Sequence, residues 1–296
     1  GSVPARTPDE AVAHIRAMLA PVVPAAAASL LWMSATALQS HASCPRQFCF
    51  SRLLRVPELT GFAAARDDAE RAAPADALPA TLRGLVVHRF CETFGPAEDV
   101  AERVRASLRD VIAARGDQYP DVVASLDEDV AVAEVGPFAR NYVTSALRRR
   151  IEAAPPGNVA SELPFAVALP SGTVMGAIDK LLLEPDGDSF RAVVVDFKTG
   201  RAHAAADFDV QMQAYSVAAA SVDPRVASVE TVLHFLGDGP DALVATTRDI
   251  GADRAAIDAR LQSIRAAGND PAGFSPRPGE RCALCRYAPI CPDAEL

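Results

Sequence analysis

The sequence predicts an α/β protein with a helical front end and a cysteine-containing tail. Apolar residues recur at helical spacing through most of the first 150 residues. After the break Pro155-Pro156-Gly157-Asn158, the spacing shortens to that of β-strands. Half of the 296 residues are hydrophobic and only 6% are aromatic. A packed core is therefore expected, while wholesale disorder and an all-β sandwich are disfavoured.

The front half of the chain is expected to be helical. Ser34 is a candidate N-cap for a helix that continues to Leu54. Helical spacing also covers 11–19, 82–94, 98–115 and 125–151. Residues 60–79 are rich in Ala and Asp and contain two prolines, which predicts a flexible excursion.

The second half is expected to alternate strands and helices. Strands are predicted at 159–169, 173–183, 190–197, 228–236 and 242–248, and helices at 207–221 and 253–267. The run Ala192-Val193-Val194-Val195 is apolar on both faces, as in a central strand covered on two sides. We therefore expect three regions: a helical region at 1–81, an α/β core at 82–270 and a cysteine-containing tail at 271–296.

Charge and hydropathy exclude some classes of function. The formal net charge is −9, from 29 basic and 38 acidic residues, so any nucleic-acid contact must use local basic patches. The longest apolar candidate, residues 20–33, is short and contains Pro21 and Pro24, which argues against a membrane span. With no recognisable signal segment at the start, a soluble, cytoplasmic protein without membrane partners is expected.

Lysine is nearly absent, since 27 of the 29 basic residues are arginine and only Lys180 and Lys198 remain. Lys198 lies in Asp196-Phe197-Lys198-Thr199-Gly200, at the end of the most apolar predicted strand. Asp196 and Lys198 are two residues apart, so their side chains point to the same face. Such a pair suits phosphate hydrolysis, because the carboxylate can hold a divalent metal ion and the ammonium can orient water or offset charge.

Asp179 lies within the preceding predicted strand, among apolar residues, where an acidic side chain is costly unless it is paired or metal-bound. If these two strands form a hairpin, Asp179 and Asp196 approach each other. Two close carboxylates raise each other's pKa and recruit Mg²⁺ or Mn²⁺. The simpler alternative is a surface hairpin with an Asp–Lys salt bridge.

Three polar residues on predicted helices are weaker candidates. His88 lies on an otherwise apolar helix, where a lone histidine is most often structural. Gln211 and Tyr215 are four residues apart and share one helix face. Their simplest interpretation is a solvent-side glutamine beside a half-buried tyrosine.

The cysteines indicate a metal centre. Cys282-x2-Cys285-x5-Cys291 is compact and lies in a loop, and a cytosolic chain argues against disulfides. The best fourth ligand is Cys44, with Cys49 and Cys91 as alternatives. Zinc accepts four cysteines, but one distant cysteine with a terminal triplet fits an iron–sulfur cluster better. A metal centre that joined Cys44 to Cys282 would close a loop of 238 residues. By analogy with a disulfide, it would raise the free energy of unfolding by about 5 kcal/mol.

Six motifs occur in order over residues 34–292: Ser34-x9-Cys44-Pro45-x2-Phe48, Gly84-x3-His88, Gly176-Ala177-Ile178-Asp179, Asp196-Phe197-Lys198-Thr199-Gly200, Gln211-x3-Tyr215 and the cysteine triplet. This ordered set resembles the RecB-like branch of the PD-(D/E)XK nuclease superfamily, specifically the iron–sulfur nucleases typified by AddB. The resemblance implies a restriction-endonuclease-like core, with a mixed central sheet flanked by helices, a helical N-terminal region that contributes one cluster cysteine, and an iron–sulfur-stapled C-terminal tail.

The resemblance also implies roles for individual residues. His88, Asp179 and Asp196 would ligate a catalytic Mg²⁺ or Mn²⁺, together with a backbone carbonyl near Phe197. Lys198 would be the catalytic lysine, with Gln211 and Tyr215 supporting the site and the DNA strand. A [4Fe–4S] cluster would be held by Cys44, Cys282, Cys285 and Cys291. Five arginines near these motifs could supply a local positive groove: Arg46, Arg52, Arg55, Arg83 and Arg89.

The function implied is that of a DNA nuclease, a single-strand-preferring exonuclease of DNA repair or recombination. Its substrate would be single-stranded DNA or duplex ends, and its partner a helicase subunit or a linked helicase domain. Two alternatives compete with it. One is a catalytically silent nuclease fold that binds DNA or docks a helicase, and the other is a zinc-stapled binding protein of unrelated fold.

Overall fold

The structure is a computed structural model that describes residues 31–57, 78–200, 202–268 and 270–295. The helix expected at 11–19 lies outside these residues, as does nearly all of the excursion expected at 60–79. In chain order the elements are β1 (Trp32–Ser34), α2 (Ala35–Ser43), α3 (Pro45–Phe48), the π-helix η1 (Cys49–Leu53), α5 (Ala80–Thr93), α6 (Val100–Arg115), η2 (Gly116–Gln118), α7 (Pro120–Ser125), α8 (Glu128–Thr144), α9 (Ala146–Ala153), η3 (Pro156–Asn158), β2 (Val159–Leu169), β3 (Gly172–Asp186), β4 (Ser189–Lys198), η4 (Ala202–Phe208), α10 (Asp209–Ala219), β5 (Val226–Phe235), β6 (Leu243–Arg248), α11 (Ile250–Ala267), η5 (Pro271–Gly273), η6 (Glu280–Leu284) and η7 (Ala288–Ile290).

A six-stranded mixed sheet forms the centre of the fold. Its strand order is β1-β3-β4-β5-β6, and β2 also pairs with β3. The pairs β1–β3 and β4–β5 are parallel, and the remaining pairs are antiparallel. The mixed central sheet flanked by helices is thus confirmed. Strand β1 was not predicted, because three residues in an apolar stretch carry too little pattern to mark a strand.

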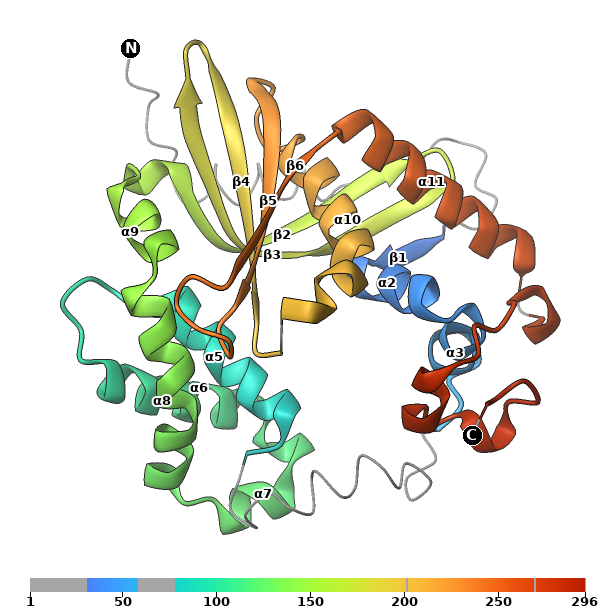
Figure 1. Cartoon of the computed structure of the whole chain (residues 1–296), viewed down its shortest axis with the longest axis horizontal. Coiled ribbons are helices and arrows are strands. Elements are labelled where there is room, and N and C mark those ends of the chain that lie inside the picture. Colours follow the sequence, from blue (N-terminus) through green and yellow to red (C-terminus); the bar gives the residue numbers. More distant parts are fainter. Residues whose placement is uncertain (1–30, 58–77, 201, 269, 296) are drawn as a thin grey trace.

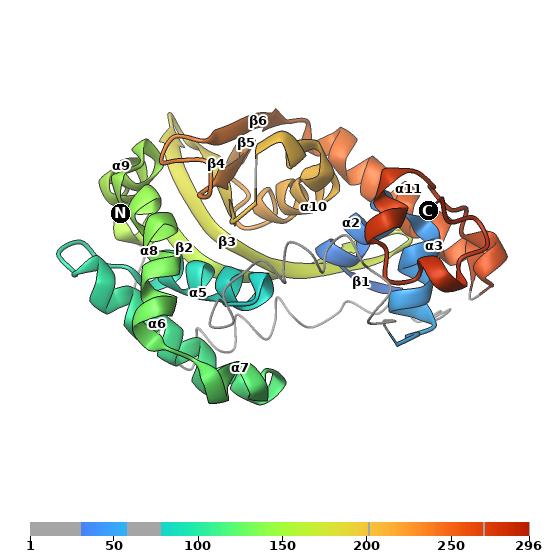
Figure 2. The same cartoon turned by 60° about the horizontal axis from the view of Figure 1, so that its bottom comes forward.

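Helices cover both faces of the sheet, as the apolar run in β4 predicts. Ala192 and Val194 pack into one core with α2, α10 and α11. Val193 and Val195 pack into a second core with α5, α6, α8 and α9. Figure 1 shows these two groups of helices on opposite sides of the sheet. Figure 2 shows α10 and α5 on opposite faces of the long, curved strand β3.

Two predicted helices are each divided in the structure. The helix expected over 34–54 breaks at Cys44, which is extended at φ −155° and ψ 109° because the following Pro45 disfavours helical backbone. The helix expected over 125–151 breaks at Ser145, whose hydroxyl accepts a hydrogen bond from Arg148 N and caps α9. Ser34 is the predicted N-cap, and its Oγ accepts from Ala37 N at 3.0 Å.

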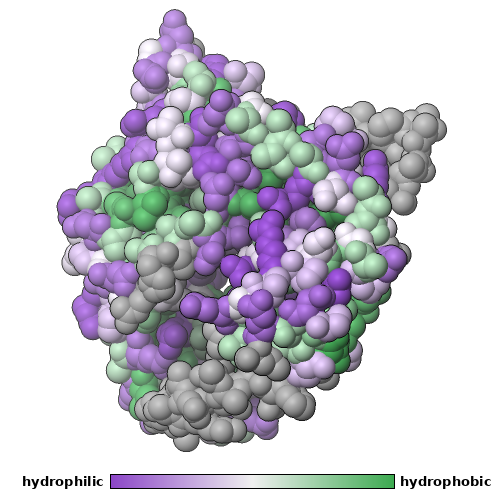
Figure 3. All heavy atoms as spheres, turned by 45° about the vertical axis from the view of Figure 1, so that its right-hand side comes forward, coloured by the Kyte–Doolittle hydropathy of each residue, from purple (hydrophilic) through white to green (hydrophobic). Residues whose placement is uncertain are grey.

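The tail packs against the front of the chain. Phe274 is fully buried beside Phe48 of α3, with ring centroids 6.0 Å apart. Both Figures 1 and 2 show the C-terminal segment beside α3. Hydrophilic residues predominate on the face shown in Figure 3, including the protruding tip of the β3–β4 hairpin at its top. Within the described residues, no helix is long and apolar enough to cross a membrane.

Candidate active site and cysteine pocket

The β3–β4 hairpin brings Asp179 and Asp196 together, as predicted. The ladder pairs Lys180 with Val195, so Asp179 and Asp196 occupy the next facing positions, where the two strands part. Phe197 N donates a 2.9 Å hydrogen bond to Asp179 Oδ2 and fixes that carboxylate across the gap. Both aspartates are buried, Asp196 at 1% exposure. The surface hairpin considered as an alternative is therefore wrong.

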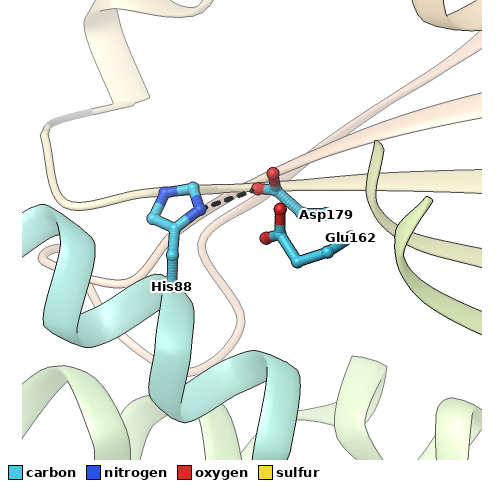
Figure 4. Close-up of side chains that lie close together, drawn as sticks. All are labelled: His88, Glu162 and Asp179. Atoms are coloured by element: carbon cyan, nitrogen blue, oxygen red, sulfur yellow. Dashed lines mark ion pairs between the residues drawn. The ribbon is translucent and has the colours of Figure 1, made fainter. Parts of the chain in front are cut away.

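His88 and Glu162 complete a compact group of metal-ligand atoms with Asp179 (Figure 4). His88 Nδ1, from α5, lies 3.2 Å from Asp179 Oδ2. Glu162 lies on β2 opposite Asp179, where its φ of 45° interrupts the ladder. One ligand atom from each residue lies within 4.8 Å of the others. Sequence reasoning missed Glu162, although an acidic residue within a predicted strand was a usable signal.

The titratable groups of the site shift one another's pKa. Burial alone would lower the pKa of His88, but the hydrogen bond and charge of Asp179, with the charge of Asp196, raise it to about 9. Burial raises the pKa of Asp196, and the nearby charge of Asp179 raises it further. Burial and mutual repulsion therefore disfavour the charged forms of the two carboxylates, and a bound divalent cation would relieve this cost.

Lys198, Gln211 and Tyr215 form one hydrogen-bonded chain around Asp196. Lys198 Nζ lies 2.6 Å from Asp196 Oδ2 and donates to Gln211 Oε1 at 3.2 Å. Gln211 Nε2 contacts Asp196 Oδ1 at 3.1 Å and Tyr215 Oη at 2.7 Å. Gln211 and Tyr215 share one face of α10, as their spacing predicts, but both are buried, so the solvent-side interpretation is wrong. Phe208 lies under the Lys198 ammonium at 4.2 Å.

The site opens into a groove lined by residues of α5 and α6. Its walls include His88 and Glu162, together with Arg89 and Arg115. The groove encloses about 1110 Å³, counted to its open mouth. Among the described residues, the His88 and Glu162 side of the site is therefore open to this groove.

The four cysteines predicted to bind one metal centre line a single pocket. Cys44 enters it from the end of α2, and Cys282, Cys285 and Cys291 enter it from the tail. The two alternative ligands, Cys49 and Cys91, are instead fully buried in the two cores. No three of the four sulfur atoms lie within 4.8 Å of one another, so among the described residues the cysteines share a pocket without forming the close metal-ligand group that was expected.

Contacts between the tail and α2–α3 hold this pocket together. Arg277 and Arg281 donate to the carbonyls of Ala42 and Ser43 at the end of α2. These cations satisfy carbonyls that the helix leaves free, and they face the negative end of its dipole. Arg46 donates to Phe274 O at 3.0 Å.

Comparison with known proteins defines the class. The family model of the PD-(D/E)XK nuclease superfamily matches residues 32–292. The chain belongs to this superfamily, whose members are generally metal-dependent nucleases, and DNA is the substrate that it implies. No curated protein matches the chain. Among solved structures, the crystal structure of SSO0001 aligns over 81% of this chain and 98% of its own, at 15% identity. Its TM-score of 0.35 is too low for an argument about fold or function.

Proposed function

We propose that the chain is a metal-dependent nuclease that hydrolyses phosphodiester bonds of DNA, with single-stranded DNA as its preferred substrate. One observation carries this proposal: His88, Asp179, Asp196 and Lys198 converge from α5, β3 and β4 beside an open groove. Phosphodiester hydrolysis requires groups that hold a cation and a positive charge that stabilises the transition state, and this set supplies both.

The residues present fit a hard divalent cation. Three carboxylates and one imidazole are the ligands that suit Mg²⁺ or Mn²⁺. Asp196 Oδ2 is buried and has no hydrogen-bond partner within the described residues, although it pairs with the Lys198 charge. His88, Asp179 and Asp196 would hold the ion, and Glu162 is a fourth candidate ligand. When bound, it would polarise the scissile phosphate and lower the pKa of a water molecule.

The chain's own residues orient the reaction. Lys198 would position the attacking water and offset the negative charge that develops on the phosphate. Gln211 holds both Lys198 and Asp196, so it sets the distance between the ammonium and the carboxylate. Tyr215, bonded to Gln211, fixes the amide in turn. Gln211 and Tyr215 therefore act as positioning residues.

We further propose that the cysteine pocket holds a [4Fe–4S] cluster, as in the RecB-like and AddB-like nucleases that the sequence resembles. The support is that one pocket is lined by the four cysteines of the ordered motifs and by neither alternative cysteine. A tetrahedral zinc ion would hold its thiolates about 3.8 Å apart, from a Zn–S distance of about 2.3 Å. No three of the four sulfur atoms lie within 4.8 Å of one another, so the choice between zinc and an iron–sulfur cluster rests on the sequence resemblance and on the measured metal content.

The second candidate function is a catalytically silent nuclease fold that binds DNA or docks a helicase. Loss of one catalytic group would favour it, but His88, Asp179, Asp196 and Lys198 are all present and in contact as pairs. Within the nuclease proposal, we also propose the finer role of an exonuclease that acts with a helicase in DNA repair or recombination.

The test is incubation of anaerobically purified protein with end-labelled single-stranded DNA, in Mn²⁺, in Mg²⁺ and in EDTA. We expect cleavage with either ion and none in EDTA. Asp188→Asn, on the exposed hairpin tip, is the matched control for Asp196→Asn and should cleave normally. A wild-type protein that binds but never cuts would favour the silent module.

A broad visible absorption band with bound iron would support the cluster, and zinc in colourless protein would contradict it.

A further inference from the structure

A second surface pocket lies at the edge strand β1, away from the catalytic residues. Its lining includes Trp32, Ser34, Ser51, Arg52 and Arg55. It encloses about 720 Å³, counted to its open mouth, and none of the described residues that line it carries a carboxylate. Trp32 is the only tryptophan of the chain and is 42% exposed. An exposed tryptophan beside two arginines is unusual unless it meets a ligand, because large aromatic side chains are normally buried.

The two arginines of this pocket differ from the others near the predicted motifs. Arg46 donates to the Phe274 carbonyl, Arg83 pairs with Glu134 at 2.7 Å, and Arg89 pairs with Glu92 and Asp110. Arg52 and Arg55 are both exposed, and neither guanidinium forms a hydrogen bond or ion pair with any residue that the structure describes. No side chain that the structure describes therefore neutralises their positive charge.

The backbone presents these arginines in an irregular segment. Arg52 lies in the π-helix η1, and Arg55 has a φ of 50°, in the left-handed region that non-glycine residues rarely adopt. Both features carry a conformational cost, and such irregularities concentrate at binding sites. Their effect here is that Arg52 and Arg55, three residues apart, reach the same pocket as Trp32.

Strand register connects the pocket with the catalytic site. Met33 packs in the core, so Trp32 faces the opposite side of the sheet. The exposed residues Pro164 and Met175 continue that face toward Glu162. Trp32 pairs with Thr173, six residues before Asp179 on β3, so the pocket lies about 20 Å along the strand from the catalytic carboxylates. An extended nucleic-acid strand a few nucleotides long covers such a distance.

We propose that this pocket, formed by Trp32, Arg52 and Arg55, is a subsite for the single-stranded DNA substrate. A base stacks on the Trp32 indole while Arg52 and Arg55 bind the adjoining phosphates. Stacking on an aromatic ring together with arginine contacts to phosphates is the general chemistry of single-strand recognition, and it requires no particular base. The inference rests on the proposed nuclease function for the identity of the ligand, and it adds where the strand is held.

The single tryptophan permits a direct test in EDTA, where the 296-residue chain should bind without cleaving. We expect dT15 to quench Trp32 fluorescence, whereas an abasic oligonucleotide of equal length should bind more weakly and leave the fluorescence unchanged. By anisotropy with labelled dT15, Trp32→Ala should weaken binding about 5- to 100-fold, and Trp32→Phe should restore most of it. Arg52→Ala combined with Arg55→Ala should lower the salt dependence of binding by about 1.4 in log–log slope.

Arg225→Ala, an exposed arginine beyond the far end of β4, is the matched control and should bind normally. Unchanged dT15 affinity in both Trp32→Ala and the double arginine variant, with native circular dichroism, would overturn the subsite. Cleavage assays separate this result from failure of the proposed function. If the wild type cleaves DNA and Trp32→Ala changes neither cleavage nor binding, the subsite is wrong and the nuclease proposal stands. If DNA quenches the Trp32 fluorescence but the wild type does not cleave in Mn²⁺, the nuclease proposal is wrong and the subsite stands.

Discussion

The proposed catalytic site around Asp179 and Asp196 and the cysteine pocket both join distant parts of the chain, but they are built differently. Asp179 and Asp196 are buried at the parting of two paired strands, and backbone and side-chain hydrogen bonds fix their carboxylates. The cysteines of the pocket are half-buried and sit on short 3-10 turns or at the break after α2. Arginine contacts to carbonyls hold that region rather than a sheet.

The difference indicates which site depends on the fold and which depends on its ligand. The two cores of the domain support the catalytic residues, so their geometry should persist without any metal. The tail contributes few buried side chains, chiefly Phe274 and Tyr287. A covalently bound centre would fasten this tail, much as a disulfide or structural metal staples a small unit.

The largest expected effect is on catalysis. Asp196→Ala should lower the cleavage rate about 1000-fold or more, because it removes a metal ligand and releases Lys198 from its partner. The visible spectrum and melting temperature should remain close to those of the wild type, since the cysteine pocket is separate. Asp188→Ala, on the exposed hairpin tip, serves as the matched control, and a large change in iron content in Asp196→Ala would show that the two sites are coupled.

The next largest effect is on stability. Cys285→Ser should lower the free energy of unfolding by about 5 kcal/mol, because it opens the link between the tail and α2. Treatment of the wild type with an iron chelator should produce the same loss and should leave the variant unchanged. Urea titration measures both. Equal stability of the chelated and untreated wild type would contradict a structural cluster.

A smaller effect tests the residue that sequence reasoning missed. Glu162→Gln should raise the Mn²⁺ concentration that gives half-maximal cleavage about 10- to 100-fold, and activity should recover at high Mn²⁺. Glu92→Gln is the matched control, because Glu92 lines the same groove but lies outside the close ligand group. Equal Mn²⁺ dependence in the two variants would remove Glu162 from the metal site.

The smallest effect concerns a pair remote from both sites. Hydrogen bonds from Arg150 and then Arg191 lower the pKa of Glu184 to about 2. A lowered pKa stabilises the fold above about pH 4.5, and this contribution is lost as the pH falls toward 2. Glu184→Gln should therefore cost about 1 kcal/mol at pH 7, since solvent screens the pair, and the difference should vanish near pH 2. A constant difference across this range in urea titrations would contradict the assignment.

Much of the fold could be predicted because the patterns were long. The strand expected at 159–169 agrees with β2, and the hairpin that joins Asp179 to Asp196 followed from two apolar strands and a turn. The break at Cys44 was missed because helical spacing continues through it, although Pro45 opposes helix there. The division into regions 1–81, 82–270 and 271–296 remains a prediction.

The sequence by itself singled out the residues that we propose carry the chemistry: the retained Lys198, the aspartates within apolar strands and the cysteines at the two ends. Local patterns reveal these residues because each is a polar or reactive residue at a position where the surrounding composition favours a different residue type. Only the tertiary structure decided that Glu162 joins His88, that Cys44 rather than Cys49 or Cys91 faces the tail, and that Trp32 shares a pocket with two exposed arginines. These facts depend on strand register and helix packing, which bring together residues that no local spacing relates.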